Sequence, residues 1–513
     1  MIGRAALALA ALLTSSAVAP PGDDAAPDRA TILANVSTAL GATATAYHET
    51  EETISSNGVT IVEHEAVRGE SSRNVYVSGP FHTEDGVDRG QAWHQNDNGQ
   101  TILDQPDPHP PTPDVTTDTV RRIHAPIEAY VLASLNAKGY GAKVYVDPSS
   151  WQMVRAEVIE PNGTVTTTYD DVHLDHGRTF SHHSHTVNDI SRTSNDVRVT
   201  AYDLDPVTDD EVAIARPLRA LVTFPSASGP VTLPTQFVGG DIVVRVTING
   251  RGLDFALDTG ASGIVMDLDV AKQLGLPLYD RESAVVARRF TTARTIVPEM
   301  HVGDLVMRNV AVQLVPAGWD TSSSVKEVGL LGFDFLAELG VTLDYEHHKV
   351  TVVPDLDYAP PSDPHTTPVE VRIGDGVPLA SVSINGAVGE RWILDTGGAG
   401  TFLIFGYFAS RHPEALRDEH HLGAQSGAAI FTGVGGDFVA LPYAIANLQL
   451  ATFDVTDIVG YLVITKGSYD YDSDGVIGAM FLQLFTVELD YGHSRVYLVP
   501  NAATLRQMHP LVK

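Results

Sequence analysis

The sequence predicts a mainly β protein, in which an N-terminal β-rich α+β domain precedes two similar β lobes, each closed and barrel-like. Two observations lead to this fold class. Apolar and polar residues alternate along much of the chain, which is typical of half-buried strands. A set of short motifs also occurs twice, in the same order, in the C-terminal half, and such a repeat indicates two copies of one structural unit. The length of 513 residues leaves room for two or three domains.

The N-terminal domain is predicted to span residues 30–220. One helix is expected at about residues 31–47 and another at residues 126–138, where apolar residues recur at helical spacing. Elsewhere, alternating runs separated by Asn-Gly and Pro-rich turns predict strands. In this general pattern the region resembles periplasmic curved-sheet lipoprotein-carrier and sensor domains, although no residue motif defines the likeness.

A histidine-rich segment, residues 173–185, stands out within this domain. Its candidate ligands are His173, Asp175, His176, His182, His183 and His185. A metal site is conceivable, because these are metal-ligand residue types. No regular ligand spacing on a helix or strand is evident, so we favour a polar solvated loop and assign no metal.

The clearest part of the repeat is an apolar strand that runs into Asp-Thr-Gly. The two triplets are Asp258-Thr259-Gly260 and Asp395-Thr396-Gly397. Upstream of each triplet lies an Ile-Asn-Gly turn, which ends at Gly250 in the first copy and Gly386 in the second. Asn-Gly between two alternating apolar runs predicts a β-hairpin.

The downstream part of the repeat is an apolar-apolar-Gly block that ends at Gly332 and again at Gly478. Leu-Asp-Tyr follows in both copies, with the same spacing of 12 residues from that glycine to the aspartate. Each copy then closes on a similar strand. These matches place the two lobes at residues 233–356 and 366–500, joined by a Pro-rich linker.

Each lobe resembles a lobe of the retropepsin-like aspartic proteases, whose signature is a strand, Asp-Thr-Gly and a later apolar-apolar-Gly block. Two lobes in one chain also resemble the pepsin-like arrangement, but each lobe is short and closer to a retropepsin subunit. The resemblance covers a little over half the chain. It implies an aspartic endopeptidase that acts on a peptide or protein substrate and needs a water molecule but no cofactor.

The chemistry of such an enzyme needs two carboxyl groups that face each other. Two carboxylates close together do not both ionise readily, so one can act as a base on water while the other donates a proton. We assign Asp258 and Asp395 to this catalytic dyad. Since one chain supplies both residues, no dimer is needed and a monomer is expected.

The neighbouring residues are expected to support the dyad. The resemblance implies that Thr259 and Thr396 tie the two loops together by hydroxyl hydrogen bonds. Glycine permits tight turns and close approach, which suits the glycines of both triplets and of the downstream blocks. These supporting glycines are Gly260, Gly397, Gly332 and Gly478.

Ala261 and Gly398 follow the triplets at positions where pepsin-like relatives commonly carry Ser or Thr. A hydroxyl there would donate a hydrogen bond to the carboxylate, and its loss should raise the pKa of the dyad. The sequence therefore predicts a weakly acidic to neutral pH optimum.

A glycine-tipped hairpin could form a flap over the substrate. The candidate flap glycines in the second lobe are Gly433, Gly435 and Gly436, and a plain surface hairpin is the alternative. The matching region of the first lobe carries Arg288 and Arg289. These arginines could line the edge of a cleft, although solvated side chains are the commoner case.

The composition excludes several classes of function. The formal net charge of −31 argues against nucleic-acid binding. The chain has no cysteine, so disulfides, thiol catalysis and Cys-ligated zinc are ruled out.

The N-terminus, residues 1–19, combines one arginine, a short apolar run and small residues, which predicts a secretory signal peptide. The apolar run is too short to span a bilayer. We therefore expect an exported protein, periplasmic or extracellular, without stable insertion into a membrane.

Two other functions stay open from sequence. The protein could be a catalytically inactive, protease-like protein that binds peptides. Alternatively, the N-terminal domain could act as an envelope carrier for a lipid or polypeptide.

Overall fold

The computed structural model describes residues 26–508 apart from 43, 107–114, 116, 161–162, 226–228, 286–288, 317–324, 399, 401, 417–426, 434–435 and 466–472. The predicted signal peptide lies outside these residues. The chain divides into two compact units, Met1–Gln95 with Asp107–Arg216 and Asn96–Pro106 with Pro217–Lys513. A short segment from the middle of the predicted N-terminal domain therefore belongs to the second unit.

The mainly β prediction is confirmed, because both units consist largely of strands. None of the helices in the described part of the chain is long and apolar enough to cross a membrane.

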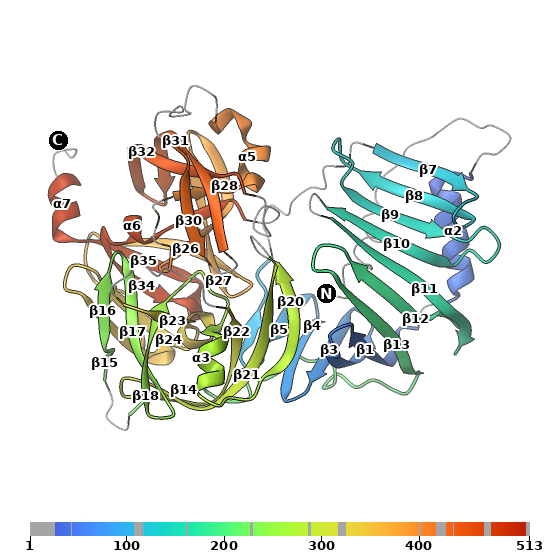
Figure 1. Cartoon of the computed structure of the whole chain (residues 1–513), viewed down its shortest axis with the longest axis horizontal. Coiled ribbons are helices and arrows are strands. Elements are labelled where there is room, and N and C mark those ends of the chain that lie inside the picture. The colour runs from blue at the N-terminus through green and yellow to red at the C-terminus, as the bar shows by residue number, and fades with distance from the viewer. Residues whose placement is uncertain are drawn as a thin grey trace. The chain divides into compact units, whose positions relative to one another are not determined.

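The first unit is an antiparallel sheet with helix α2 (Arg29–Leu40) packed on it (Figure 1). Its strands are β1 (Ala46–Ser55), β2 (Thr60–Arg68), β3 (Ser71–Ser78), β4 (Phe81–Asp88), β5 (Gln91–Gln95), β7 (Thr117–Ile123), β8 (Ala129–Leu135), β9 (Gly141–Val146), β10 (Met153–Glu160), β11 (Gly163–Asp175), β12 (Arg178–Asn188) and β13 (Thr193–Asp203). They lie in the order β5-β4-β3-β2-β1-β13-β12-β11-β10-β9-β8-β7. In the middle of the sheet β1, the first strand of this unit, pairs with β13, its last strand.

The predicted helix near the N-terminus is confirmed, although it ends earlier than expected. The side chain of Asp28 caps it by accepting a hydrogen bond from the Thr31 N–H at 2.7 Å. Ile32 and Val36 are buried in a cluster with apolar residues of β8 and β9. The helix stops at Gly41, whose positive φ of 81° ends the helical backbone.

The second predicted helix, at residues 126–138, is wrong, because this stretch contains strand β8. The strand pairs with β7 on one side and β9 on the other. Its residues from Ala129 to Ser134 are all buried, so both faces carry apolar side chains. A short apolar run of this kind has no period that separates a strand from a helix, and pairing with two neighbours decides the outcome.

The second unit contains β6 (Thr101–Leu103) and both sequence repeats. The first repeat, residues 233–356, and the segment before it form β14 (Val222–Thr223), β15 (Val231–Thr232), β16 (Thr235–Val238), β17 (Asp241–Ile248), β18 (Arg251–Leu257), β19 (Ile264–Asp267), α3 (Leu268–Gln273), β20 (Tyr279–Val285), β21 (Arg289–Val302), β22 (Leu305–Val315), β23 (Glu327–Leu331), α4 (Phe333–Leu336), β24 (Leu339–Asp344) and β25 (Lys349–Pro354).

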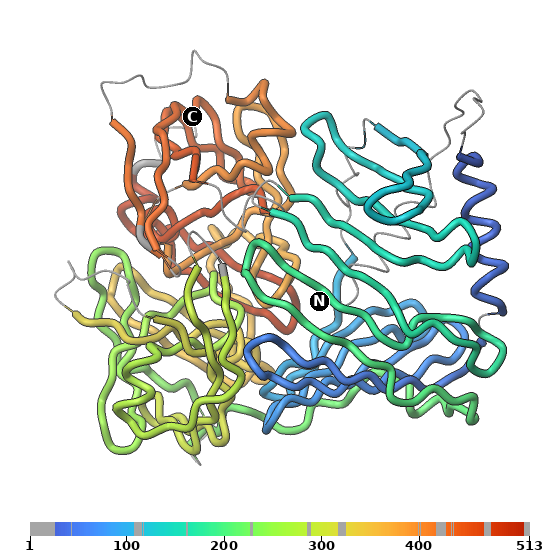
Figure 2. The backbone as a smooth tube through the Cα atoms, turned by 45° about the vertical axis from the view of Figure 1, so that its right-hand side comes forward, coloured from blue at the N-terminus to red at the C-terminus, as the bar shows by residue number. Residues whose placement is uncertain are grey.

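The second repeat, residues 366–500, follows a short helix. The elements from this helix to the C-terminus are η1 (Asp355–Asp357), β26 (Thr367–Gly374), β27 (Val377–Ile384), β28 (Ala387–Leu394), β29 (Phe402–Ile404), α5 (Gly406–Arg411), η2 (Pro413–Leu416), β30 (Ala429–Gly433), β31 (Gly436–Leu450), β32 (Phe453–Val463), β33 (Gly475–Ile477), α6 (Ala479–Leu482), β34 (Phe485–Asp490), η5 (Tyr491–His493), β35 (Arg495–Pro500) and α7 (Ala502–Met508). Figure 2 shows the two repeats as two lobes, yellow-green below and orange-red above.

Each repeat closes into a ring of strands. In the first the order is β22-β19-β23-β18-β17-β21, and β21 pairs back to β22. In the second the order is β27-β28-β33-β29-β32-β31, and β31 pairs back to β27. Both predicted Asn-Gly hairpins are confirmed, because Asn249 and Asn385 turn the chain between paired strands with positive φ.

A central sheet joins the two repeats in the order β15-β25-β24-β34-β35-β26. Its middle pair, β24 and β34, comes from corresponding positions of the two repeats and runs antiparallel. One continuous apolar core extends through both repeats and includes the fully buried Phe255, Phe335 and Trp392. The two lobes are therefore fixed against each other by backbone pairing and by a shared core.

Candidate active site

The two Asp-Thr-Gly triplets occupy equivalent loops, one in each repeat. In each repeat the strand before the triplet runs parallel to the strand of the apolar-apolar-Gly block, β18 beside β23 and β28 beside β33. The Asp258 N–H donates to the Leu331 carbonyl at 3.0 Å, and the Asp395 N–H donates to the Ile477 carbonyl at 2.9 Å. The same pairing thus positions each aspartate at the end of its strand.

Reciprocal threonine hydrogen bonds connect the two loops. The Thr259 hydroxyl donates to the Leu394 carbonyl at 2.7 Å and accepts from the Thr396 N–H at 3.0 Å. The Thr396 hydroxyl donates to the Leu257 carbonyl at 2.7 Å and accepts from the Thr259 N–H at 3.1 Å. Both threonines are 1% exposed, so these bonds are not open to competition from bulk water.

The carboxyl groups of Asp258 and Asp395 lie against each other's loops. A Cβ atom added at Gly260 would lie 2.6 Å from the Asp395 Cγ, and one added at Gly397 would lie 2.5 Å from the Asp258 Cγ. Only glycine leaves room for the opposite carboxyl at these two positions. Each aspartate also accepts a hydrogen bond of 2.8 Å from the glycine N–H of its own triplet, and Asp395 accepts a second from the Gly398 N–H at 3.0 Å.

Both carboxyl groups have raised pKa values. Burial, followed by the charge of Asp395 and a hydrogen bond with it, raises the pKa of Asp258 well above its usual range. Burial raises the pKa of Asp395, whereas hydrogen bonds from Asp258 and from the backbone oppose this shift. Carboxyl groups coupled in this way titrate as a pair. The direction agrees with a weakly acidic to neutral optimum, which itself stays a prediction.

Gly332 and Gly478 lie directly behind the two triplet loops. A Cβ atom at Gly332 would meet the Ala261 carbonyl oxygen at 2.3 Å, and one at Gly478 would meet the Gly400 carbonyl oxygen at 2.0 Å. In both repeats this glycine therefore packs closely against the backbone after the triplet, and a short helix, α4 or α6, follows it in place of the apolar strand expected from sequence.

Both repeats carry a hairpin at the position considered for a flap. In the second repeat β30 and β31 pair from Ala429 to Gly433, with Gly433 opposite Gly436, while Gly435 lies outside the described residues. In the first repeat β20 and β21 form the matching hairpin, in which Arg289 is exposed and Arg288 is outside the described residues.

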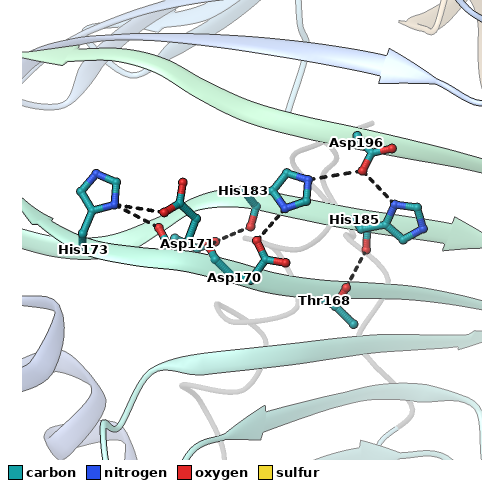
Figure 3. A network of polar contacts seen from close by, with 8 residues as sticks. Thr168, Asp170, Asp171, His173, His183, His185 and Asp196 are labelled. Atoms are coloured by element: carbon teal, nitrogen blue, oxygen red, sulfur yellow. Dashed lines mark hydrogen bonds and ion pairs between the residues drawn. The ribbon is translucent and has the colours of Figure 1, made fainter.

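The histidine-rich segment is not the loop expected from sequence, because its candidate ligands lie on β11 and β12, apart from His176 in the turn between these strands (Figure 3). His183 binds Asp170 at 2.6 Å and Asp196 at 3.3 Å, and His185 binds Asp196 at 3.1 Å. Sheet register sets these contacts across three strands. Among the residues described, no group of three or more candidate ligands could hold a metal ion.

Two kinds of residue near the triplets were given no role from sequence. Asp334, just after Gly332, is 8% exposed and accepts a hydrogen bond from the Ile264 N–H at 3.2 Å. Tyr345 and Tyr491, from the repeated Leu-Asp-Tyr blocks, are buried, and burial together with the charge of nearby aspartates, Asp395 among them, raises their pKa values. The repetition of Leu-Asp-Tyr was a usable signal for the tyrosines.

A comparison with protein-family models finds an aspartyl protease match at residues 244–335. The matched range contains Asp258 and Gly332, and it covers less than half of the chain. An aspartyl protease-like region is therefore present in the first repeat. No curated protein matches the chain.

Three bacterial proteins are among the solved structures that are similar to part of the chain. A putative outer membrane lipoprotein-sorting protein domain from Vibrio parahaemolyticus has 10% identity, covers 36% of this chain and 94% of its own, and gives a TM-score of 0.27. A LolA superfamily protein from Nitrosomonas europaea has 10% identity, covers 36% and 96%, and also gives 0.27. A DUF1329 family protein from Desulfovibrio piger has 8% identity, covers 36% and 95%, and gives 0.28.

Proposed function

We propose that the second unit is an aspartic endopeptidase with two retropepsin- or pepsin-like lobes and a catalytic dyad of Asp258 and Asp395. The reciprocal threonine bonds that hold the two triplet loops together are the observation that carries this proposal. If each triplet were only a junction between a strand and a turn, the fold would need neither these bonds nor a glycine packed against the opposite carboxyl. The match of residues 244–335 to the aspartyl protease model supports it independently.

The surroundings of the two carboxyls suggest which of them holds the shared proton. Three backbone N–H groups favour the ionised form of Asp395, those of Gly397 at 2.8 Å, Gly398 at 3.0 Å and Gly260. The N–H groups of Gly260, at 2.8 Å, and of Ala261 oppose the raised pKa of Asp258, but burial, the charge of Asp395 and a hydrogen bond with it still raise this pKa well above its usual range. We therefore assign the proton of the resting pair to Asp258.

The reaction then follows from this assignment. The Asp395 carboxylate accepts a proton from water as the water oxygen attacks the scissile carbonyl carbon. Protonated Asp258 donates a hydrogen bond to the carbonyl oxygen as negative charge develops on it. The proton held by Asp395 then passes to the leaving amine when the C–N bond breaks. The substrate would be a peptide or protein, and the hairpins β30–β31 and β20–β21 are the candidates for covering it.

The proposal extends to the setting in which the enzyme acts. An exported monomer, periplasmic or extracellular, fits the N-terminal sequence and the two repeats joined by β24 and β34 in one chain.

The deciding experiment is hydrolysis of a diverse peptide library across pH by the full chain. Asp258→Asn and Asp395→Asn should each lower kcat/KM by about 10²–10⁴-fold, because each removes a proton-transfer group. Asp254→Asn is the matched control. Asp254 lies on β18, the strand that leads to Asp258, and forms an ion pair with Arg245 at 3.2 Å. Its activity should stay near that of the unsubstituted chain, and a statine-type transition-state mimic should inhibit both.

Unchanged activity in either dyad variant would contradict the assignment of that residue. A chain that binds peptides or the statine-type mimic without hydrolysis would instead be the catalytically inactive peptide-binding protein. A lipid or polypeptide that co-purifies with the full chain, with no hydrolysis, would favour the carrier function.

A further inference from the structure

Residues 96–100 form a turn that belongs to the second unit, although strands of the first unit precede and follow it along the chain. It lies in the segment Asn96–Pro106, between β5 and β7 along the chain. Asn98 and Gln100 are 3% and 5% exposed, although both are polar. Buried amide side chains need hydrogen-bond partners, and in this turn the partners come from the first repeat.

The main partner is Asp334. The Asn96 Nδ2 donates to Asp334 Oδ1 at 2.8 Å, and the Asn98 Nδ2 donates to Asp334 Oδ2 at 2.9 Å. The Gln100 Nε2 donates to the Asp334 backbone carbonyl at 3.0 Å. Three side chains of the turn therefore hold one buried acidic residue through both its carboxylate and its backbone.

Asp334 in turn holds the loop that follows Asp258. Its Oδ2 accepts from the Ile264 N–H at 3.2 Å, and a Cβ atom at Gly263 would lie 3.0 Å from the same oxygen. The residue before it, Phe333, donates its N–H to the Ala261 carbonyl at 2.9 Å. Asn98 is thus connected to the loop after the Asp-Thr-Gly triplet through a single carboxylate oxygen.

Further bonds fix the turn in the first repeat. The Asn98 side chain forms a two-way pair with the backbone of Ala311, accepting from its N–H at 2.8 Å and donating to its carbonyl at 3.2 Å. The Asp97 carboxylate accepts from Arg294 Nη1 at 2.8 Å. Loss of Asn98 would leave buried groups of Ala311 and Asp334 without these bonds.

We propose that Asn98 is a positioning residue for the loop that follows Asp258, so that the first repeat is incomplete as a catalytic lobe without the segment Asn96–Pro106. The second repeat differs at the equivalent place. There Met480 occupies the position of Asp334 and is 49% exposed. The predicted effect of Asn98 on turnover rests on the proposed function, whereas its predicted effect on the loop does not.

The chain supplies a matched control in the turn at residues 136–140. Asn136 Oδ1 accepts from the N–H groups of Lys138 and Tyr140 at 2.9 and 3.0 Å, as Asn96 Oδ1 does from residues 98 and 100 at 3.1 and 3.0 Å. The backbone bonds of the two turns also correspond. Lys138 is the counterpart of Asn98 but is exposed.

The first measurement is hydrogen exchange of the full chain, followed in peptides that cover residues 258–266. Asn98→Ala should speed exchange there by about tenfold or more, because a buried acceptor loses its donor. Lys138→Ala should leave exchange there unchanged. Asn96→Ala should loosen the same peptides, whereas Asn136→Ala, which removes an equivalent turn bond, should not.

Equal exchange of residues 258–266 in Asn98→Ala and Lys138→Ala would overturn the inference. Because exchange reports the loop and not turnover, this result stands even if the protein does not hydrolyse peptides. The experiment can therefore contradict the positioning role of Asn98 without contradicting the proposed function, and the reverse also holds.

Turnover gives a second reading that a general loss of stability would not reproduce. Asn98→Ala should lower kcat by about tenfold with KM nearly unchanged, since a displaced dyad loop affects the reaction more than binding. Asn98→Asp places a second carboxyl beside Asp334, so its kcat should be lowest near neutral pH and recover on acidification, when a shared proton restores a hydrogen bond. A deficit of Asn98→Asp that does not change with pH would contradict the positioning role.

Discussion

The two repeats of the second unit share one frame around their aspartates but differ in what surrounds that frame. In both, an Asp-Thr-Gly loop is held by a parallel strand, a buried threonine and a glycine that faces the opposite carboxyl. Beneath the loop, however, the first repeat has buried Asp334 with its amide partners, and the second has half-exposed Met480. The proposed chemistry needs the shared frame, and each repeat supports that frame with different residues.

The two aspartates are therefore related by an approximate symmetry but have unequal surroundings. Two backbone N–H groups, of Gly260 and Ala261, favour the ionised form of Asp258, whereas three, of Gly397, Gly398 and Gly260, favour that of Asp395. An additional amide donor stabilises the ionised form of Asp395. The proposed assignment of acid and base therefore depends on small differences in backbone donors between two loops that share the Asp-Thr-Gly triplet.

The largest expected effect tests the shared frame. Gly260→Ala and Gly397→Ala should each lower kcat/KM by about 10²-fold or more, because the added methyl group would displace the opposite carboxyl. Peptide hydrolysis by the two variants measures this directly. Similar losses in both would show that the two loops are equally constrained.

Gly252→Ala is the control for these glycine substitutions. Its added Cβ would first meet the flexible Arg245 side chain at 3.2 Å, which can move aside. Activity should therefore be retained. Full activity in Gly260→Ala would contradict the packing of the Asp395 carboxyl against that residue.

The next effect tests what differs between the repeats. Asp334→Ala should lower the free energy of unfolding of the second unit by about 3 kcal/mol, because buried donors of Asn96 and Asn98 lose their acceptor. Met480→Ala at the equivalent position should change it by less than about 0.5 kcal/mol, since the side chain is half exposed. Urea unfolding of both variants makes the comparison, and equal effects would contradict it.

Much of the shared frame could be predicted from sequence because the motifs that build it are local and occur twice. Asp-Thr-Gly, Asn-Gly and apolar-apolar-Gly each fix a short stretch of backbone, and their spacing predicts how they meet. The contact between Asn98 and Asp334 could not be predicted in this way. The two residues are separated by 236 positions, and nothing in an Asn-Gly turn indicates a distant partner.

The errors in the N-terminal domain have a related cause. Strand β8 is buried on both faces, so its apolar run has no period that excludes a helix. The histidines at 173–185 become neighbours of aspartates only through the register of β11, β12 and β13. Pairing between strands, which the sequence does not state, decided both cases.

The stability of the protein should also depend on pH through the first repeat, because Asp334 titrates and Met480, at the equivalent position of the second repeat, does not. Burial raises the pKa of Asp334 to about 6 in the folded protein, against 3.8 for the ordinary group. The folded state thus binds the proton more tightly, so this group stabilises the fold most below about pH 4 and loses that contribution as the pH rises to about 6. We expect a loss of about 2 kcal/mol across this window.

Asp334→Asn removes this titration while keeping the size of the side chain. Urea unfolding of the two proteins at pH 4, 5, 6 and 7 should therefore show that the free energy of unfolding of the unsubstituted chain, relative to that of Asp334→Asn, rises by about 2 kcal/mol as the pH falls from 6 to 4. A difference that does not vary with pH would mean that Asp334 has an ordinary pKa in the folded protein.

The smallest effect concerns the two threonines, where the repeats are nearly identical. Each hydroxyl donates at 2.7 Å and accepts at 3.0 or 3.1 Å, and both side chains are 1% exposed. Thr259→Val and Thr396→Val should each lower the free energy of unfolding by about 1–2 kcal/mol, because a buried carbonyl and a buried N–H lose their partner. The two values should agree within about 0.5 kcal/mol, as expected for sites with the same contacts. Calorimetric unfolding measures both, and a clear inequality would show that the symmetry of the frame does not extend to its energetics.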